Sequence, residues 1–239
     1  MATEISGSTG VNKIQDGTIV NADVSDIAAS KLTGALPAIS GASLTGLTSG
    51  LTSQQVFTSS GTWTKPSGIT KIKVYVTGGG GGACATNTDD TGGGGGAGGT
   101  AIKIIDVTSI SSETVTIGAG QAARGNNNGT SINHGNSSSF GSHCSATGGS
   151  NGGISWSIGG AGGSATGGDI NLYGGDGDGG GIDITNHSYL SSGTGGASYW
   201  GGGARGSNHN ASTAVAARAY GSGGGGGVNT TDGGAGAGG

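Results

Sequence analysis

The chain has 239 residues, of which 61 are glycine and only 9 % are charged, and its formal net charge is −4. Glycine occurs in blocks rather than at every third position, which excludes collagen. The nine Lys and Arg residues are spread singly, so the basic stripe needed for nucleic-acid binding is absent, and no apolar run approaches the ~18 residues of a membrane span. Glycine-rich chains without a period are usually disordered, so disorder is the alternative to any folded interpretation.

The first fifty residues carry single Ile, Leu and Val side chains every three to five residues among Ser, Thr, Ala and Asp. This spacing is too irregular for a heptad repeat, and such a sparse apolar series cannot form a core alone. We assign residues 1–54 to a separate N-terminal segment, extended and fibre-like. It is expected either to be shared between identical chains or to be largely unfolded.

Residues 55–239 form the second predicted domain, which begins with a strand pattern. Residues 69–77 alternate and are β-branched, and 100–107 and 113–117 read as two more strands joined at 108–112. Each strand runs directly into or out of a glycine block. We therefore predict a mostly irregular fold with short β-strands, in which glycine rods continue a small β base.

The glycine blocks are predicted to form a bundle of polyglycine II helices. Such helices are extended, have three residues per turn and lack internal hydrogen bonds, so they must bond to neighbouring rods. Substituting Gly94 by Val should separate neighbouring rods. If successive rods run away from and back toward the strands, their connections alternate between the two ends. This alternation places 137–147, 164–173 and 198–200 at the strand end, and 83–91, 121–136, 150–158, 182–192 and 204–222 at the far end.

Two stretches resemble phage proteins. Residues 10–47, GVNKIQDGTIVNADVSDIAASKLTGALPAISGASLTGL, resemble linker and shaft segments of phage tail fibres, which are commonly trimeric. From 56 to 239, FTSSGTWTKPSGITKIKVYVTGGGGGA, GGGGGAGGTAIK, VTIGAG, SSSFGS, GGDINLYGGDG and GGASYWGGGA resemble the glycine-rich domain of phage tail-fibre and tail-tip adhesins. More loosely, they are similar to the polyglycine II sandwich adhesins at the tips of T-even-type long tail fibres, whose distal loops bind receptors. Such domains usually close with another strand, so we expect the chain to continue beyond Gly239.

The resemblance implies a receptor-binding protein of the virion, assembled in the host cytoplasm without a signal peptide. Its partners would be a bacterial surface glycan or outer-membrane protein and, through residues 1–54, other tail-fibre or virion proteins. It would be a homotrimer, bind no nucleic acid and insert into no membrane.

Receptor contacts are predicted in the far loops, where irregular sequence collects on a repetitive scaffold. Aromatic faces beside polar and charged groups suit recognition of sugars or proteins, although the aromatic residues could equally pin the loops to the rods. The candidate contacts are Arg124, Asn127, His187, Tyr189, His209, Arg218 and Tyr220.

Other aromatic residues are assigned to the strand end. Phe57, Trp63, Tyr75 and Phe140 are predicted core residues, because they lie in strand-like segments. Tyr173 and Trp200 are expected to be structural and near the strands.

No cofactor, metal or catalytic function is predicted. Asp176, Asp178 and Asp183 are interpreted as solvated turn carboxylates rather than a calcium site, because their spacing misses the repeat of calcium-binding β-rolls. The four histidines lack the spacing of metal ligands. Cys84 and Cys144 are too few for a disulfide-stapled scaffold, and isolated thiols are favoured over a bridge.

No nucleophile and base are singled out among the many Ser residues, so an enzyme is not expected. Two non-enzymatic alternatives to an adhesin remain. One is a purely structural fibre or filament subunit, and the other is an ice-binding bundle of glycine-rich helices. The unequal lengths of the predicted loops disfavour ice binding.

Overall fold

The computed structural model describes residues 53–85, 91–123, 134–153, 158–181, 191–208, 214–228 and 233–239. The chain divides into two units, Met1–Gln54 and Gln55–Gly239, and the fold described below is that of the second. In the described ranges the backbone forms strands, turns and extended segments, and none of them contains a helix able to cross a membrane.

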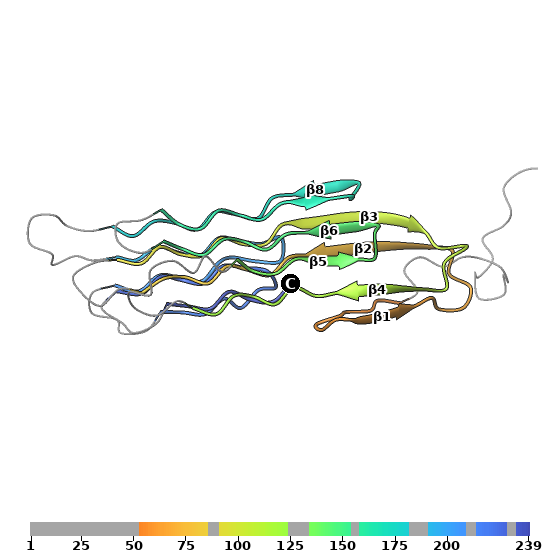
Figure 1. The fold of residues 1–239 in the computed structure, drawn as a ribbon, viewed down its shortest axis with the longest axis horizontal. Helices are drawn as coiled ribbons and strands as arrows, with labels where there is room; N and C mark the ends of the chain where they lie inside the picture. Colours follow the sequence, from red (N-terminus) through yellow and green to blue (C-terminus); the bar gives the residue numbers. More distant parts are fainter. Residues whose placement is uncertain are drawn as a thin grey trace, which may run out of the picture. The chain divides into compact units, whose positions relative to one another are not determined.

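Short antiparallel strands form two sheets (Figure 1). In the three-stranded sheet, β3 lies between β2 and β8, and in the five-stranded sheet the order is β1-β4-β5-β6-β7. The strands are β1 (Gly61–Thr64), β2 (Lys71–Thr77), β3 (Thr100–Asp106), β4 (Ser112–Thr116), β5 (Ser138–Phe140), β6 (Cys144–Ala146), β7 (Ala165–Thr166) and β8 (Ile170–Leu172).

The strands predicted at 69–77, 100–107 and 113–117 are confirmed as β2, β3 and β4, to within two residues at each end. The predicted hairpin at 137–147 is confirmed as β5 and β6. However, β3 and β4 do not pair with each other. Between them the chain crosses from the three-stranded sheet to the five-stranded one.

The core lies between the two sheets, where β2 and β3 pack against β5 and β6. Trp63 and Phe140 are buried there in an edge-to-face pair with ring centroids 5.6 Å apart, and Phe57 packs against the same cluster. These three predictions of core or core-facing aromatics are confirmed. Tyr75 is 39 % exposed, so its prediction as a core residue is wrong. Successive strand residues face opposite sides, and the neighbouring Val76 occupies the inner side.

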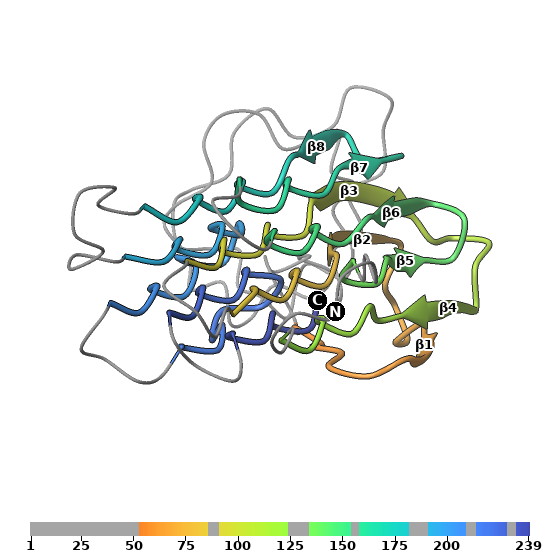
Figure 2. The ribbon, with the colours of Figure 1, turned by 60° about the vertical axis from the view of Figure 1, so that its left-hand side comes forward.

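Extended glycine-rich segments leave the strands and run side by side, as two views show (Figures 1 and 2). One continues β2 beyond Thr77, and residues 91–99 lead back into β3. At the end remote from the strands the segments are tied together in pairs. Thr91 forms a β-bridge with Val228, and Ser191 forms bridges with both Gly181 and Asn208.

Candidate functional site

Residues 92–99 form a regular pattern of backbone hydrogen bonds with their neighbours. Every N–H group from Gly92 to Gly99 donates a hydrogen bond to another segment, over 2.8–3.1 Å. The accepting carbonyls lie on three segments, residues 221–228, 147–153 and 173–181. Successive N–H groups donate to these segments in turn, so every third N–H group donates to the same segment. From Gly92 onward, the accepting carbonyls are those of Gly227, Gly153, Asp178, Gly224, Ser150, Gly175, Gly221 and Thr147.

The carbonyl groups of residues 92–97 and 99 accept hydrogen bonds from three further segments, again in rotation. Residues 191–197, 78–85 and 158–164 donate to these carbonyls. Residues 92–99 are therefore surrounded by neighbours on all sides, and they are buried throughout. Because both partners of each bond are backbone groups, no side chain takes part in this network.

Close approach of the backbones explains why glycine is needed here. A Cβ atom on Gly95 would lie 2.1 Å from the carbonyl oxygen of Gly81, and one on Gly96 would lie 2.1 Å from that of Ala161. Both distances are far below van der Waals contact, so a side chain would push the segments apart. At Gly202, by contrast, nothing lies within 4 Å of an added Cβ.

Residues 202–208 form an outer segment, and their exposure also repeats every three residues. Gly202, Arg205 and Asn208 are exposed, whereas Ala204 and Ser207 are buried. The segment is held by its backbone, with the N–H groups of Ala204 and Ser207 donating inward to residues 223–228. One residue in three can thus carry a long side chain outward without disturbing the packing.

Most of the predicted contact residues lie outside the described ranges, namely Arg124, Asn127, His187, Tyr189 and His209. What the structure describes are the segment ends that flank them. Ser191 is bridged to both Gly181 and Asn208, so both ends of the connection 182–190 lie beside the start of the connection 209–213. The structure describes the positions of two candidates, Arg218 and Tyr220.

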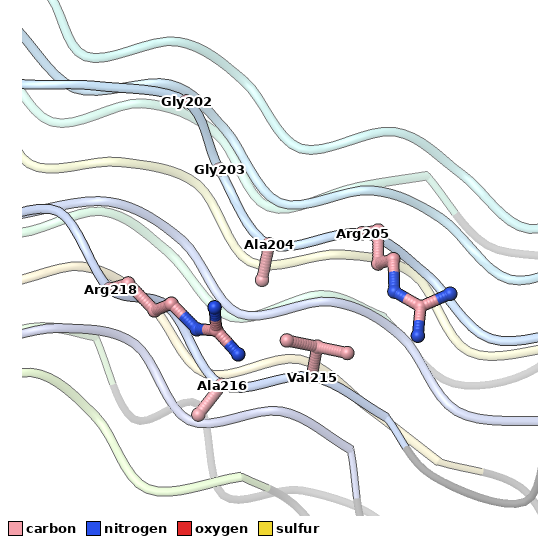
Figure 3. Close-up of a pocket in the computed structure, with 7 residues that line it drawn as sticks. All are labelled: Gly202, Gly203, Ala204, Arg205, Val215, Ala216 and Arg218. Atoms are coloured by element: carbon pink, nitrogen blue, oxygen red, sulfur yellow. The ribbon is translucent and has the colours of Figure 1, made fainter.

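Arg218 lies on residues 214–219, a segment without glycine. Its guanidinium group faces a groove of about 320 Å³ between this segment and residues 202–208. Figure 3 shows the guanidinium groups of Arg218 and Arg205 on either side of Val215. Arg205 is not among the predicted contact residues, although it shares a three-residue spacing with the exposed Gly202 and Asn208. The groove is lined by Gly202, Gly203, Ala204, Arg205, Val215, Ala216 and Arg218.

Tyr220 lies at the strand end, so its prediction as a distal-loop residue is wrong. It belongs to a turn closed by a 3.0 Å hydrogen bond from the N–H of Ser222 to the carbonyl of Ala219. Gly221, in the left-handed region at φ 69°, lies against Thr77 at the end of β2. The expected loop 204–222 is instead two hydrogen-bonded segments on either side of residues 209–213, followed by this turn.

The predicted strand-end positions of 164–173 and 198–200 are confirmed. The first contains β7, which pairs with β6, and β8, which pairs with β3. In the second, the indole N–H of Trp200 donates to the Thr77 hydroxyl over 2.8 Å, and its ring lies 5.6 Å from that of Tyr75. The ring of Tyr199 contacts those of Tyr75 and Trp200, so these three exposed aromatic residues form a cluster beside β2. Tyr173 is 81 % exposed.

Two of the carboxylates that were predicted to be solvated in turns accept hydrogen bonds from neighbouring segments. Asp176 accepts a hydrogen bond from the N–H of Gly162, and Asp178 accepts one from the hydroxyl of Thr194. Each thus satisfies a polar group of a neighbouring segment. Asp183 lies outside the described ranges, and across those ranges no three His, Cys, Asp or Glu side chains gather into a metal-binding group.

Cys84 and Cys144 are buried thiols that form no disulfide with each other, as the sequence favoured. Cys144 begins β6 and faces the core between the sheets. Burial there raises the pKa of its thiol above the ordinary value, because the thiolate would be poorly solvated.

Comparison with known families identifies a family for most of the chain. The sequence pattern of the glycine-rich domain family matches residues 52–239. The chain belongs to the glycine-rich domain family. No curated protein matches the sequence closely enough to be recognised as a relative. The glycine-rich domain thus includes both sheets, the hydrogen-bonded segments and the Arg205–Arg218 groove.

Proposed function

We propose that the chain is the receptor-binding protein of a bacteriophage tail fibre, a non-enzymatic adhesin that binds a glycan or an outer-membrane protein on the bacterial surface. The observation that carries the proposal is the network of backbone hydrogen bonds that fixes the ends of the connections between segments. Bridges such as Thr91–Val228 and Ser191–Asn208 hold these ends. The sequences between these ends can therefore change without loss of the fold. A surface that must adapt to receptors that vary requires this property.

The glycine-rich segments are proposed to be polyglycine II helices. This helix has three residues per turn and bonds only to its neighbours. The rotation of hydrogen-bond partners along residues 92–99 and the three-residue exposure pattern of residues 202–208 support this assignment.

Residues 1–54 are proposed to attach the adhesin to other virion proteins and to assemble a homotrimer. Their sparse apolar series offers too little to bury within one chain. The protein would then be assembled in the host cytoplasm and function in the virion.

Adsorption tests the proposed function. The purified full chain, labelled with a fluorophore, is incubated with a panel of Gram-negative bacteria, and binding is measured by flow cytometry. We expect binding to some strains and not to others. Replacing residues 183–189 and 209–213 by Gly-Ser sequence of equal length should abolish binding, while the melting temperature changes by only a few degrees.

The matched control is Tyr173→Ser, which alters a highly exposed aromatic residue next to the strands and should leave binding intact. A chain that binds no strain would support the alternative of a purely structural subunit. If the replaced connections left binding unchanged while replacement of residues 1–50 abolished it, the receptor would be recognised by the N-terminal segment and the loop assignment would be wrong.

A further inference from the structure

The Arg205–Arg218 groove concentrates a scarce side chain. The whole chain contains three arginines, Arg124, Arg205 and Arg218. Both of those that lie in the described ranges line the same groove, although they belong to different segments. Each stands on an outer position of the glycine-rich region, where the packing allows but does not require a long side chain.

Neither guanidinium group has a carboxylate within ion-pair distance among the described residues. The ion pair found in those ranges joins His143 to Glu113. Two aspartates of the glycine-rich region, Asp176 and Asp178, instead accept hydrogen bonds from Gly162 and Thr194. Two positive groups thus face one groove in a chain whose net charge is negative.

Val215 lies between the two guanidinium groups, as Figure 3 shows. Ala204 and Ala216 are further aliphatic residues that line the groove. Guanidinium forks match the geometry of carboxylate and phosphate oxygens and can donate two parallel hydrogen bonds. Small aliphatic groups offer a surface to the C–H face of a sugar ring.

We propose that this groove binds an oxyanion carried on a sugar, either the carboxylate of a uronic acid or a sugar phosphate. Arg205 and Arg218 each offer a guanidinium group to an oxyanion of the ligand, and Val215, which lies between them, contacts the ring. The inference deepens the proposed function, on which it rests for the source of the ligand, an acidic glycan of the bacterial surface. It places recognition on the flank of the bundle as well as at its far end.

Isothermal titration calorimetry on the full chain tests the proposal, with tetragalacturonic acid, mannose 6-phosphate and neutral maltotetraose as probes. At least one acidic probe should bind, and maltotetraose should bind at least tenfold more weakly. Arg205→Gln and Arg218→Gln should each raise the Kd of the acidic probe about tenfold, since each removes a charge-assisted hydrogen bond. Raising the NaCl concentration should also weaken binding, because both partners are exposed to solvent. The acidic probe that binds more tightly identifies the source of the oxyanion.

Lys73→Gln is the matched control, because it removes one positive charge from β2, outside the groove. It should leave the Kd unchanged. Equal binding of maltotetraose, no binding of either acidic probe, or an unchanged Kd in the double variant Arg205→Gln/Arg218→Gln would overturn the proposal. Calorimetry uses no bacteria, so the two proposals can fail separately. If the chain binds the oxyanion but adsorbs to no strain, the proposed function is contradicted and the binding site in the groove is supported. If the chain adsorbs to bacteria but binds neither acidic probe, the groove proposal is overturned and the proposed function is supported.

Discussion

A Cβ atom on Gly94 would lie 1.9 Å from the carbonyl oxygen of Thr194 in the neighbouring segment. Gly94→Ala should therefore force the segments apart, because the obstacle is backbone that cannot rotate away. We expect the free energy of unfolding to fall by about 3 kcal/mol or more, the upper range for overpacking. Urea denaturation followed by tryptophan fluorescence would measure it.

Gly202→Ala provides the matched control for Gly94→Ala. Nothing lies within 4 Å of the added Cβ, and the position is exposed. Its free energy of unfolding should stay within about 0.5 kcal/mol of the wild type, or rise, because alanine restricts the unfolded chain. Equal destabilisation by both substitutions would mean that close backbone packing does not set the requirement for glycine.

Amide exchange should distinguish the hydrogen-bonded segments from disordered glycine linkers. Every N–H group of residues 92–99 and 223–227 donates to a neighbouring segment. Exchange of these amides requires separation of segments, so we expect it to be slower by several orders of magnitude than in an unfolded peptide. Hydrogen–deuterium exchange monitored by NMR would test this, and rapid exchange throughout both stretches would favour disorder.

Trp200→Phe isolates one hydrogen bond between the 198–201 turn and β2. Phenylalanine keeps an aromatic ring beside Tyr75 but cannot donate to the Thr77 hydroxyl. We expect a loss of about 0.5–1.5 kcal/mol of unfolding free energy. Thr77→Val removes the acceptor, and the double variant should then cost less than the sum of the two single variants. Strict additivity would show that the bond contributes nothing.

The buried thiol of Cys144 predicts a loss of stability at alkaline pH. Its pKa is raised in the folded state by burial, so the unfolded chain releases the thiol proton at lower pH than the folded one. The stabilising contribution is complete below the ordinary thiol pKa and declines as pH rises above it. Between pH 7 and pH 9.5 the wild type should therefore lose more unfolding free energy than Cys144→Ala does. Parallel pH profiles of the two proteins would contradict this.

Deleting residues 1–50 should leave a folded monomer. The two sheets and the bonds between glycine-rich segments are contained within residues 55–239. The melting temperature should remain within a few degrees, and light scattering should give the mass of one chain. An equally stable trimer of the truncated protein would show that residues 1–50 are not the assembly segment.

The strands were predictable because alternation alone determines which side chains face the core. The stretch KIKVYV encodes β2, and the same alternation could have placed Tyr75 correctly, since it shares the parity of Lys71 and Lys73 rather than that of Val74 and Val76. A preference for burying aromatic residues obscured that signal. The partition into two sheets was not predictable, because it depends on contacts between residues far apart in the chain.

The error at Tyr220 has a different origin. Residues 214–219, AVAARA, contain no glycine and were therefore predicted to be a loop. In the structure their backbone is bonded to neighbours, with the carbonyl of Val215 accepting from Gly225 and the N–H of Ala217 donating to Ala235. Outer segments also have positions that face away from their neighbours, and there they can carry alanine and even arginine. Recognising such a segment needs the three-residue spacing, not the glycine content.

The hydrogen-bond partner along residues 92–99 changes with a period of three residues, so each amide has a fixed register relative to the neighbouring segments. Inserting one residue into this stretch would turn every amide beyond the insertion toward the wrong neighbour, and inserting two would do the same in the opposite sense. Three inserted residues would restore the original directions, at the cost of lengthening one segment relative to those around it. Evolution of this scaffold should therefore tolerate length changes of any size in the connections, but only changes by multiples of three within the segments.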